Sequence, residues 1–178
     1  MKRWIAFFLA AVLGIGGGVA LAVFFQITQV TDSSMMPGFE QGQRVLVRCN
    51  DGNGLEALGS LSFLDGFGSF DVERGDVVLF DSQVYAPTGE GKRMMKRVIG
   101  LSGDRVMITC GRVYVNNAPL EESYVFTQNI SGEMDEIRIP DGYVFVLGDN
   151  RAASTDSRSE AVGLVKEDDL AGKVLYQW

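Results

Sequence analysis

The sequence predicts a mainly β protein that carries one transmembrane helix at its N-terminus. Short runs rich in Val, Ile and Phe, each bounded by turn residues, recur after Thr31, and long amphipathic helical patterns are missing. Cys110-Gly111 between two of these runs is typical of a tight hairpin, and Pro140-Asp141-Gly142 of a turn that leads into a strand. The predicted strands are residues 44–48, 76–80, 94–99, 105–109, 112–115, 143–147 and 173–176.

The N-terminal helix is predicted from an apolar run. The residues from Trp4 to Phe25 carry no charge, and at about 1.5 Å per residue a helix of this length spans roughly 33 Å, close to the hydrocarbon thickness of a bilayer. Lys2 and Arg3 should stay in the cytoplasm, which places the rest of the chain on the other side of the membrane. A cleavable signal peptide is the alternative, because Ala20-Leu21-Ala22 has the pattern of a cleavage site. We favour a retained anchor since apolar residues continue to Phe25.

The predicted anchor divides the chain into two parts. Residues 1–28 form a basic tip and the anchor, and residues 29–178 form an extracytoplasmic β domain with a flexible loop at about 50–70. The loop alternates glycines with apolar side chains, which suggests either a plain surface loop or one that dips into the membrane interface. These apolar residues are Leu61, Phe63, Leu64, Phe67 and Phe70.

Composition excludes several classes of protein chemistry. None of the 178 residues is histidine, so Ser-His-Asp, Cys-His and HExxH zinc mechanisms are excluded. The two cysteines, Cys49 and Cys110, are too few for a multi-cysteine metal site or a disulfide framework, and we expect them to remain thiols. A formal net charge of −7 argues against a nucleic-acid partner. We expect neither a metal nor a cofactor.

Without histidine, the base that the sequence offers near neutral pH is a lysine made neutral by burial. Strand alternation in residues 94–99 puts Met94 and Val98 on the same face as Lys96. Lowering a lysine pKa from about 10.4 to about 7–8 disfavours the charged form by about 4 kcal/mol, which desolvation on such a face can supply. The alternative is a lysine at a strand edge with its amine in solvent.

Two other segments carry groups that fit a reaction centre. The first contains Ser33 and Ser34 and continues to Pro37, which should keep the chain extended and present a hydroxyl to a substrate carbonyl. The second, residues 148–158, is polar and directly follows the apolar strand 143–147, so its side chains are candidates to orient a neighbour. An ordinary loop and a solvated turn are the respective alternatives.

These three segments, in this order after an N-terminal anchor, resemble the signature boxes of the bacterial type I signal peptidases, which are membrane-bound serine proteases with a Ser-Lys dyad. The resemblance covers nearly the whole chain and implies a signal-peptidase-like catalytic body of β-sheets. The matching runs are SMMP at 34–37, RGDVVLF at 74–80, KRVIGLSGDRV at 96–106, GRVYVNNAPL at 111–120 and GDNRAASTDSR at 148–158.

The resemblance implies that Ser34, rather than Ser33, is the nucleophile and that Lys96 is its general base. It also implies that the backbone N–H of Ser34 donates to the oxyanion. Some members of the family add a hydroxyl from two residues earlier, where this chain has Asp32. A carboxylate there would oppose a developing negative charge unless it turned away, so we leave the second donor unassigned.

Supporting and substrate-binding roles follow from the resemblance in the same way. Ser154 should hold the lysine amine, and Asp156 with Arg158 should form a supporting pair, while Asp149 and Arg151 should fix the loop. The positions that resemble pocket-lining residues are Met35, Phe39, Met94 and Met95. Small pockets there would accept alanine-like side chains, although Gly38-Phe39 replaces the usual Thr-Leu and should alter the floor of the cleft.

The implied protein is a single-pass enzyme of the bacterial cell membrane that cleaves exported preproteins after Ala-x-Ala-like sites, with the lipid bilayer as its other partner. One alternative is a Ser-Lys peptidase of the conjugation or self-cleaving type, which the anchor and the GDNR run disfavour. The other is an inactive anchored β module, which the presence of both Ser34 and Lys96 disfavours.

Overall fold

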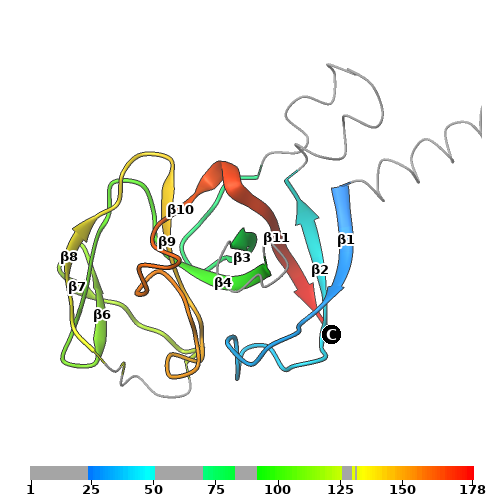
Figure 1. Cartoon of the computed structure of the whole chain (residues 1–178), viewed down its shortest axis with the longest axis horizontal. Helices are drawn as coiled ribbons and strands as arrows, with labels where there is room; N and C mark the ends of the chain where they lie inside the picture. The colour runs from blue at the N-terminus through cyan, green and yellow to red at the C-terminus, as the bar shows by residue number, and fades with distance from the viewer. Residues whose placement is uncertain (1–23, 51–69, 83–91, 126–129, 131) are drawn as a thin grey trace, which may run out of the picture.

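The computed structural model describes residues 24–50, 70–82, 92–125, 130 and 132–178, which form two antiparallel β-sheets (Figure 1). The predicted anchor up to residue 23 and the loop at 51–69 lie outside these residues. Phe70, the one residue of the apolar loop set that is described, packs against a buried apolar cluster of the larger sheet. In the described ranges, no helix has the length and apolar character needed to cross a membrane.

The larger sheet has seven strands, which run antiparallel to their neighbours. From one edge to the other these are β1 (Phe25–Gln29), β2 (Arg44–Cys49), β11 (Leu170–Gln177), β3 (Val77–Ser82), β4 (Lys92–Gly100), β9 (Tyr143–Leu147) and β10 (Val165–Lys166). A short 3-10 helix, η3 (Glu167–Asp169), connects β10 to β11. The C-terminal strand β11 therefore lies inside the sheet, between β2 and β3.

The smaller sheet has four strands, in the order β7 (Ala118–Pro119), β6 (Arg112–Val115), β5 (Arg105–Thr109) and β8 (Met134–Arg138). Its hairpin between β5 and β6 turns at Cys110 and Gly111, whose φ angles of 51° and 74° match a two-residue turn that twists with its strands. In Figure 1 this sheet lies on the left, and β1 and β2 lie on the right.

The seven predicted strands all exist as β2, β3, β4, β5, β6, β9 and β11. The turn at residues 140–142 also exists, with Gly142 at a φ of 76° directly before β9. The sequence reasoning missed β1, β7, β8 and β10, which are short or polar and lack a run of β-branched residues. Strand β1 includes residues 25–28, which the predicted division assigns to the anchor. They belong to the sheet because Ile27 pairs with Leu46 of β2.

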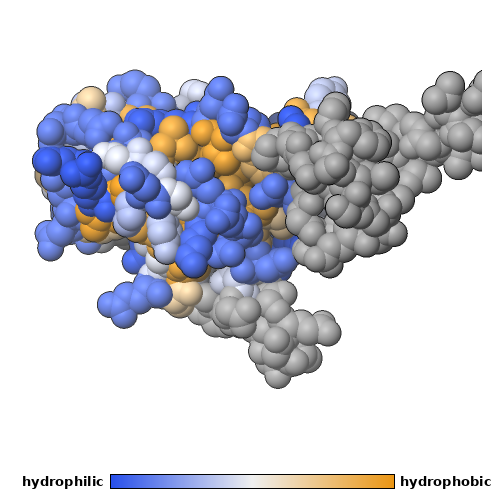
Figure 2. Space-filling view, turned by 90° about the horizontal axis from the view of Figure 1, so that it is seen from above, coloured by the Kyte–Doolittle hydropathy of each residue, from blue (hydrophilic) through white to orange (hydrophobic). Residues whose placement is uncertain are grey.

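Three buried apolar clusters stabilise the two sheets. The first joins the smaller sheet to β9, the second lies around β3, β4 and β9, and the third joins β2 and β3 to the chain that follows β1. Cys49 is buried and Cys110 is exposed, and no disulfide joins these two cysteines of the described chain. Apolar side chains also reach the surface. Figure 2 shows them in the middle of one face, with hydrophilic side chains around them.

Candidate active site

Lys96 lies in the middle of β4, and its side chain is entirely buried. Burial alternates along this strand as predicted: Met94 and Val98 are buried on the same face as Lys96, and its partner across the ladder, Val78 of β3, is fully buried. An apolar setting of this kind disfavours an ammonium relative to a neutral amine. The strand thus holds the amine of Lys96 away from water in one orientation.

Ser34 lies in the segment that connects β1 to β2, and it is only 5% exposed. The next residue, Met35, and then Phe39 are buried in the third apolar cluster, against Val45 and Leu79. The segment turns instead of running extended, because the N–H of Met36 donates to Ser33 O (3.2 Å) and that of Phe39 to Met35 O (2.9 Å). These two buried side chains therefore fix the backbone that carries Ser34.

The fold brings Ser34 and Lys96 together although they are 62 residues apart in the sequence. Lys96 Nζ donates to Ser34 Oγ over 2.7 Å, and also to the carbonyl oxygen of Met95 over 3.0 Å. A distance of about 2.6–3.2 Å is the reach expected for a nucleophile and its base. The arrangement can move a proton between a hydroxyl and an amine in a dry environment.

Asp32 makes the closest contacts to Ser34 on its other side. One carboxylate oxygen, Oδ1, accepts from the backbone N–H of Ser34 (2.9 Å) and from its hydroxyl Oγ (2.6 Å). Asp32 therefore turns toward the nucleophile. The sequence marked this residue as unusual at its position but did not predict the contact.

The segment 148–158 supports the backbone of the nucleophile from a second side. The N–H of Asn150 donates to Ser34 O (2.9 Å), and its side-chain amide donates to Ser33 O (3.1 Å). A Cβ on Gly148 would lie 2.6 Å from Ser34 O, so only glycine fits there. Sequence reasoning missed Asn150, since an asparagine after a strand is also typical of a plain turn.

Asp149 is buried and forms a bidentate ion pair with Arg97 of β4, with distances of 2.8 Å from Nε to Oδ1 and 2.6 Å from Nη2 to Oδ2. Burial raises the pKa of the Asp149 carboxyl, and the hydrogen bonds and charge of Arg97 oppose that rise. Arg97 also donates to Gly75 O (2.7 Å), and its guanidinium stacks 4.1 Å from the ring centre of Tyr124. The pair ties the segment 148–158 to the strand that carries Lys96.

Arg151 forms a second buried pair, with Glu122 of the chain between β7 and β8. Its Nη1 donates to Glu122 Oε2 over 2.9 Å, its Nη2 contacts the other carboxylate oxygen, and its Nε donates to Gly148 O over 3.0 Å. Tyr124 donates to Glu122 Oε1 over 2.8 Å, and burial, followed by the charge of Glu122, raises the pKa of its hydroxyl. Sequence reasoning missed Arg97, Glu122 and Tyr124, because no local pattern distinguishes them from surface residues.

Asp156 and Arg158 are in contact, as the sequence suggests. Asp156 Oδ1 accepts from Arg158 Nε over 2.7 Å, and Asp156 Oδ2 accepts from the N–H of Gly148 over 3.0 Å. Ser154 behaves differently from the implied role, because its buried Oγ has no hydrogen-bond partner among the described residues and packs against Gly148. The resemblance implied a hydrogen bond from this hydroxyl to the lysine amine, which the structure does not contain.

A cavity of about 90 Å³ opens beside Asp32, the residue that contacts Ser34. Its lining includes Asp32, Met94 and Met95, with Arg93 beside them and the chain from Thr28 to Thr31 along one edge. Of the four residues that the sequence suggests for substrate binding, Met94 and Met95 line this cavity. Met35 and Phe39 pack into the apolar cluster instead, so they shape the floor of the site from below.

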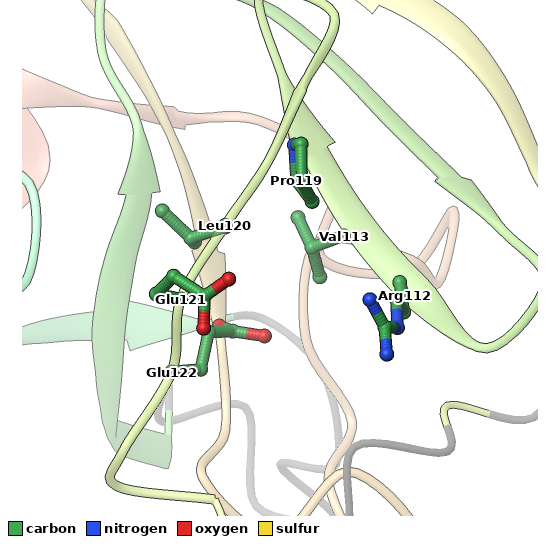
Figure 3. A pocket seen from close by; sticks show the side chains of 6 residues that line it. All are labelled: Arg112, Val113, Pro119, Leu120, Glu121 and Glu122. Atoms are coloured by element: carbon green, nitrogen blue, oxygen red, sulfur yellow. The ribbon is translucent and has the colours of Figure 1, made fainter.

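A second cavity of similar volume, about 90 Å³, lies on the smaller sheet (Figure 3). The carboxylates of Glu121 and Glu122 lie across this cavity from Arg112. It shares no lining residue with the cavity beside Asp32. Its connection to the site is through Glu122, which pairs with Arg151.

Comparisons with known proteins identify the family. The family model described as "Signal peptidase, peptidase S26" matches residues 1–178. Signal peptidase I U of Bacillus subtilis (strain 168) is 30% identical over 159 residues, which cover 84% of this chain and 73% of that protein. A signal peptidase I of Bacillus licheniformis is 28% identical over 182 residues, covering 96% and 84% respectively. The crystal structure of a signal peptidase I from Enterococcus faecalis V583 aligns with a TM-score of 0.49 and 31% identity, over 60% of this chain and 98% of that one. The chain belongs to the family of signal peptidases, peptidase S26.

Proposed function

We propose that Ser34 and Lys96 form the catalytic dyad with which this serine peptidase cleaves signal peptides. The observation that carries the proposal is the 2.7 Å contact between Lys96 Nζ and Ser34 Oγ in a buried, apolar setting. When the amine is neutral it accepts the proton of the hydroxyl, so that Oγ attacks the peptide carbonyl. The resulting ammonium then returns the proton to the leaving amine, and water hydrolyses the acyl-enzyme.

The backbone supplies the first electrostatic stabilisation of this reaction. The N–H of Ser34 lies next to its own nucleophilic oxygen and is the donor that we assign to the oxyanion. Asn150 and Gly148 support this assignment because they fix the carbonyl of Ser34 and hence the orientation of the neighbouring backbone.

The proposed substrates are exported preproteins with small residues before the cleavage site. Two relatives bear the name signal peptidase I, and the cavity beside Asp32 is small and lined in part by Met94 and Met95. Its small volume, about 90 Å³, favours alanine-like side chains over large ones. Methionine side chains adapt their shape to the residue that enters.

We also propose that the apolar N-terminal run anchors the enzyme in the bacterial membrane, with the β domain on the extracytoplasmic side. Exposed apolar side chains near the first described residues support this position for the domain: Ile27 of β1 and Tyr176 of β11 flank Leu46 in one row across the sheet, and Trp178 is half exposed beside them. Aromatic side chains of this kind are enriched where a protein meets the membrane surface. Anchoring would confine enzyme and preprotein to one surface and raise their effective concentration.

The test is cleavage of an Ala-x-Ala preprotein by the full chain in detergent. Ser34→Ala and Lys96→Ala should each abolish cleavage, whereas Ser33→Ala and Lys166→Ala, which change an adjacent and a distant exposed side chain of the same types, should retain it. Full activity in either of the first two variants would reject the dyad. The kcat/KM of the native chain should rise with pH through an apparent pKa below the value of about 10.4 for a free lysine, because the amine must be neutral to act.

A further inference from the structure

The carboxylate of Asp32 lies where the proposed reaction needs an oxyanion. An oxyanion forms on the substrate carbon bonded to Ser34 Oγ, and it must lie about 2.7–3.1 Å from its N–H donor. Asp32 Oδ1 lies close to this position, since it is 2.9 Å from Ser34 N, within the donor distance, and 2.6 Å from Ser34 Oγ. The backbone donor that we assign to the oxyanion is therefore already occupied by a carboxyl oxygen of the same chain.

The same contact also controls the proton of the nucleophile. An ionised carboxylate can only accept, so in the 2.6 Å contact Ser34 Oγ must donate to Asp32. Lys96 Nζ meanwhile donates to Ser34 Oγ over 2.7 Å. The proton that the lysine has to remove points away from it, and attack requires the hydroxyl to reorient.

We propose that Asp32 blocks the active site of the resting enzyme and that the entering preprotein displaces its carboxylate. This inference rests on the function proposed above for Ser34 and Lys96. The carbonyl oxygen of the scissile peptide replaces Asp32 Oδ1 as the acceptor for Ser34 N–H, and the freed hydroxyl turns to the amine. A carboxylate that stayed in place would repel the negative charge that develops on the substrate.

The surroundings of Asp32 allow this exchange. Asp32 is partly exposed and lines the cavity that also contains Met94 and Met95, so open space lies next to its carboxylate. A preprotein segment that fills the cavity competes for that space. Only substrates that occupy the cavity then release the nucleophile, which would limit hydrolysis of other exposed peptides.

The competing explanation is a local turn. A carboxylate that accepts from the N–H two residues later forms an Asx turn, a common device for shaping loops. Asparagine forms the same turn with a neutral oxygen, so Asp32→Asn keeps a structural role and removes the charge. Asp32→Ser removes the carboxylate and offers a hydroxyl that can donate to the oxyanion.

The experiment compares these two variants with the native full chain in detergent, using an Ala-x-Ala preprotein and a peptide boronic acid that forms a tetrahedral anion on a serine oxygen. Asp135→Asn, which removes one exposed acidic charge on β8, is the matched control. We expect Asp32→Asn and Asp32→Ser to raise kcat by about ten-fold or more, with a smaller change in KM. In both variants, no charge-assisted hydrogen bond to a carboxylate holds the N–H of Ser34 or the proton of its hydroxyl. The boronic acid should bind more tightly by a similar factor, and the unfolding temperature should stay the same.

Two results would overturn the inference. Unchanged kcat and boronic acid binding in Asp32→Asn would mean that Asp32 only shapes the turn. A loss of kcat in both folded variants would mean that its carboxylate takes part in turnover. These results are distinct from failure of the dyad, which would appear as equal cleavage by the native chain and by Ser34→Ala.

Discussion

The segment that carries the nucleophile and the segment that supports it use polar side chains in opposite ways. In residues 30–39, the polar contacts of Asp32 and Ser34 connect groups that must exchange partners during the proposed reaction. In residues 148–158, the ionic side chains of Asp149, Arg151 and Asp156 are committed to permanent partners. Apolar anchors hold the first segment in place, and buried ion pairs hold the second.

This difference indicates how the molecule separates reactivity from rigidity. The hydroxyl, the amine and the carboxylate around Ser34 share single atoms and compete for them, so small changes in one alter the others. The supporting segment keeps its geometry because each charge there is matched and hydrogen-bonded. Substitutions of these three groups should therefore change turnover, and those in the supporting segment should change stability first.

The largest effect on cleavage is expected for Lys96→Met, which should change turnover without lowering stability. Methionine has nearly the shape of lysine and suits the apolar face between Met94 and Val98, so the free energy of unfolding should stay the same or rise. Cleavage should fall by about 10³-fold or more, because the base is lost. Urea denaturation and preprotein cleavage measure the two quantities. A large loss of stability in Lys96→Met would show that the amine supports the fold as well as the reaction.

Asp149→Ala should instead lower stability while leaving cleavage detectable. It leaves the guanidinium of Arg97, which is 13% exposed, without its bidentate partner. Breaking a buried pair from one side costs about 3–5 kcal/mol, and urea denaturation should show a loss of this size. At a low denaturant concentration where the variant is still folded, residual cleavage should remain detectable. A variant as stable as the native chain would mean that solvent replaces the carboxylate.

The sequence predicted most strands and the contact between Ser34 and Lys96 better than it predicted the supporting contacts, and the reason is physical. Lys96 is marked by its apolar neighbours on one strand, and the burial of Met94 and Val98 depends only on local alternation. Arg97 lies on the same strand, but its partners Asp149 and Tyr124 are distant in the sequence. Polar residues that pair across the fold have no local pattern, since their partners depend on which elements the topology brings together.

The positions of Met35 and Phe39 show a second limit of prediction from the sequence. Both belong to the motif that suggests a substrate pocket, yet they are buried in an apolar cluster under Ser34. A large apolar residue beside a nucleophile is compatible with either position, and only the turn at residues 33–39 decides which side it faces. Strand β1 was missed for a related reason, because its sequence follows an apolar run without any turn residue.

Gly148→Ala tests the contact between the two segments directly. The added methyl group would lie 2.6 Å from Ser34 O and would also meet the side chain of Ser154. The two segments must move apart, which should cost about 1–3 kcal/mol and should lower kcat more than it raises KM, since the nucleophile shifts. Unchanged cleavage and stability would mean that the two segments separate without strain.

The smallest effect is expected for the exposed pair of Asp81 and Arg93, which offers a control for the buried pair of Asp149 and Arg97. Hydrogen bonds from Arg93 hold the pKa of Asp81 below its ordinary value of 3.8, although partial burial opposes this. Because the pKa in the folded chain is lowered, the pair contributes to stability above about pH 3.8 and loses that contribution as the pH falls through the lowered value. Both side chains are about half exposed, so Asp81→Ala should cost less than about 1 kcal/mol.

An NMR titration of Asp81 in the native chain and in Arg93→Ala should show the pKa rising toward 3.8 in the variant. If Asp81→Ala cost as much as Asp149→Ala, burial would not be what separates the two pairs, and the stability assigned to the supporting segment would need another source.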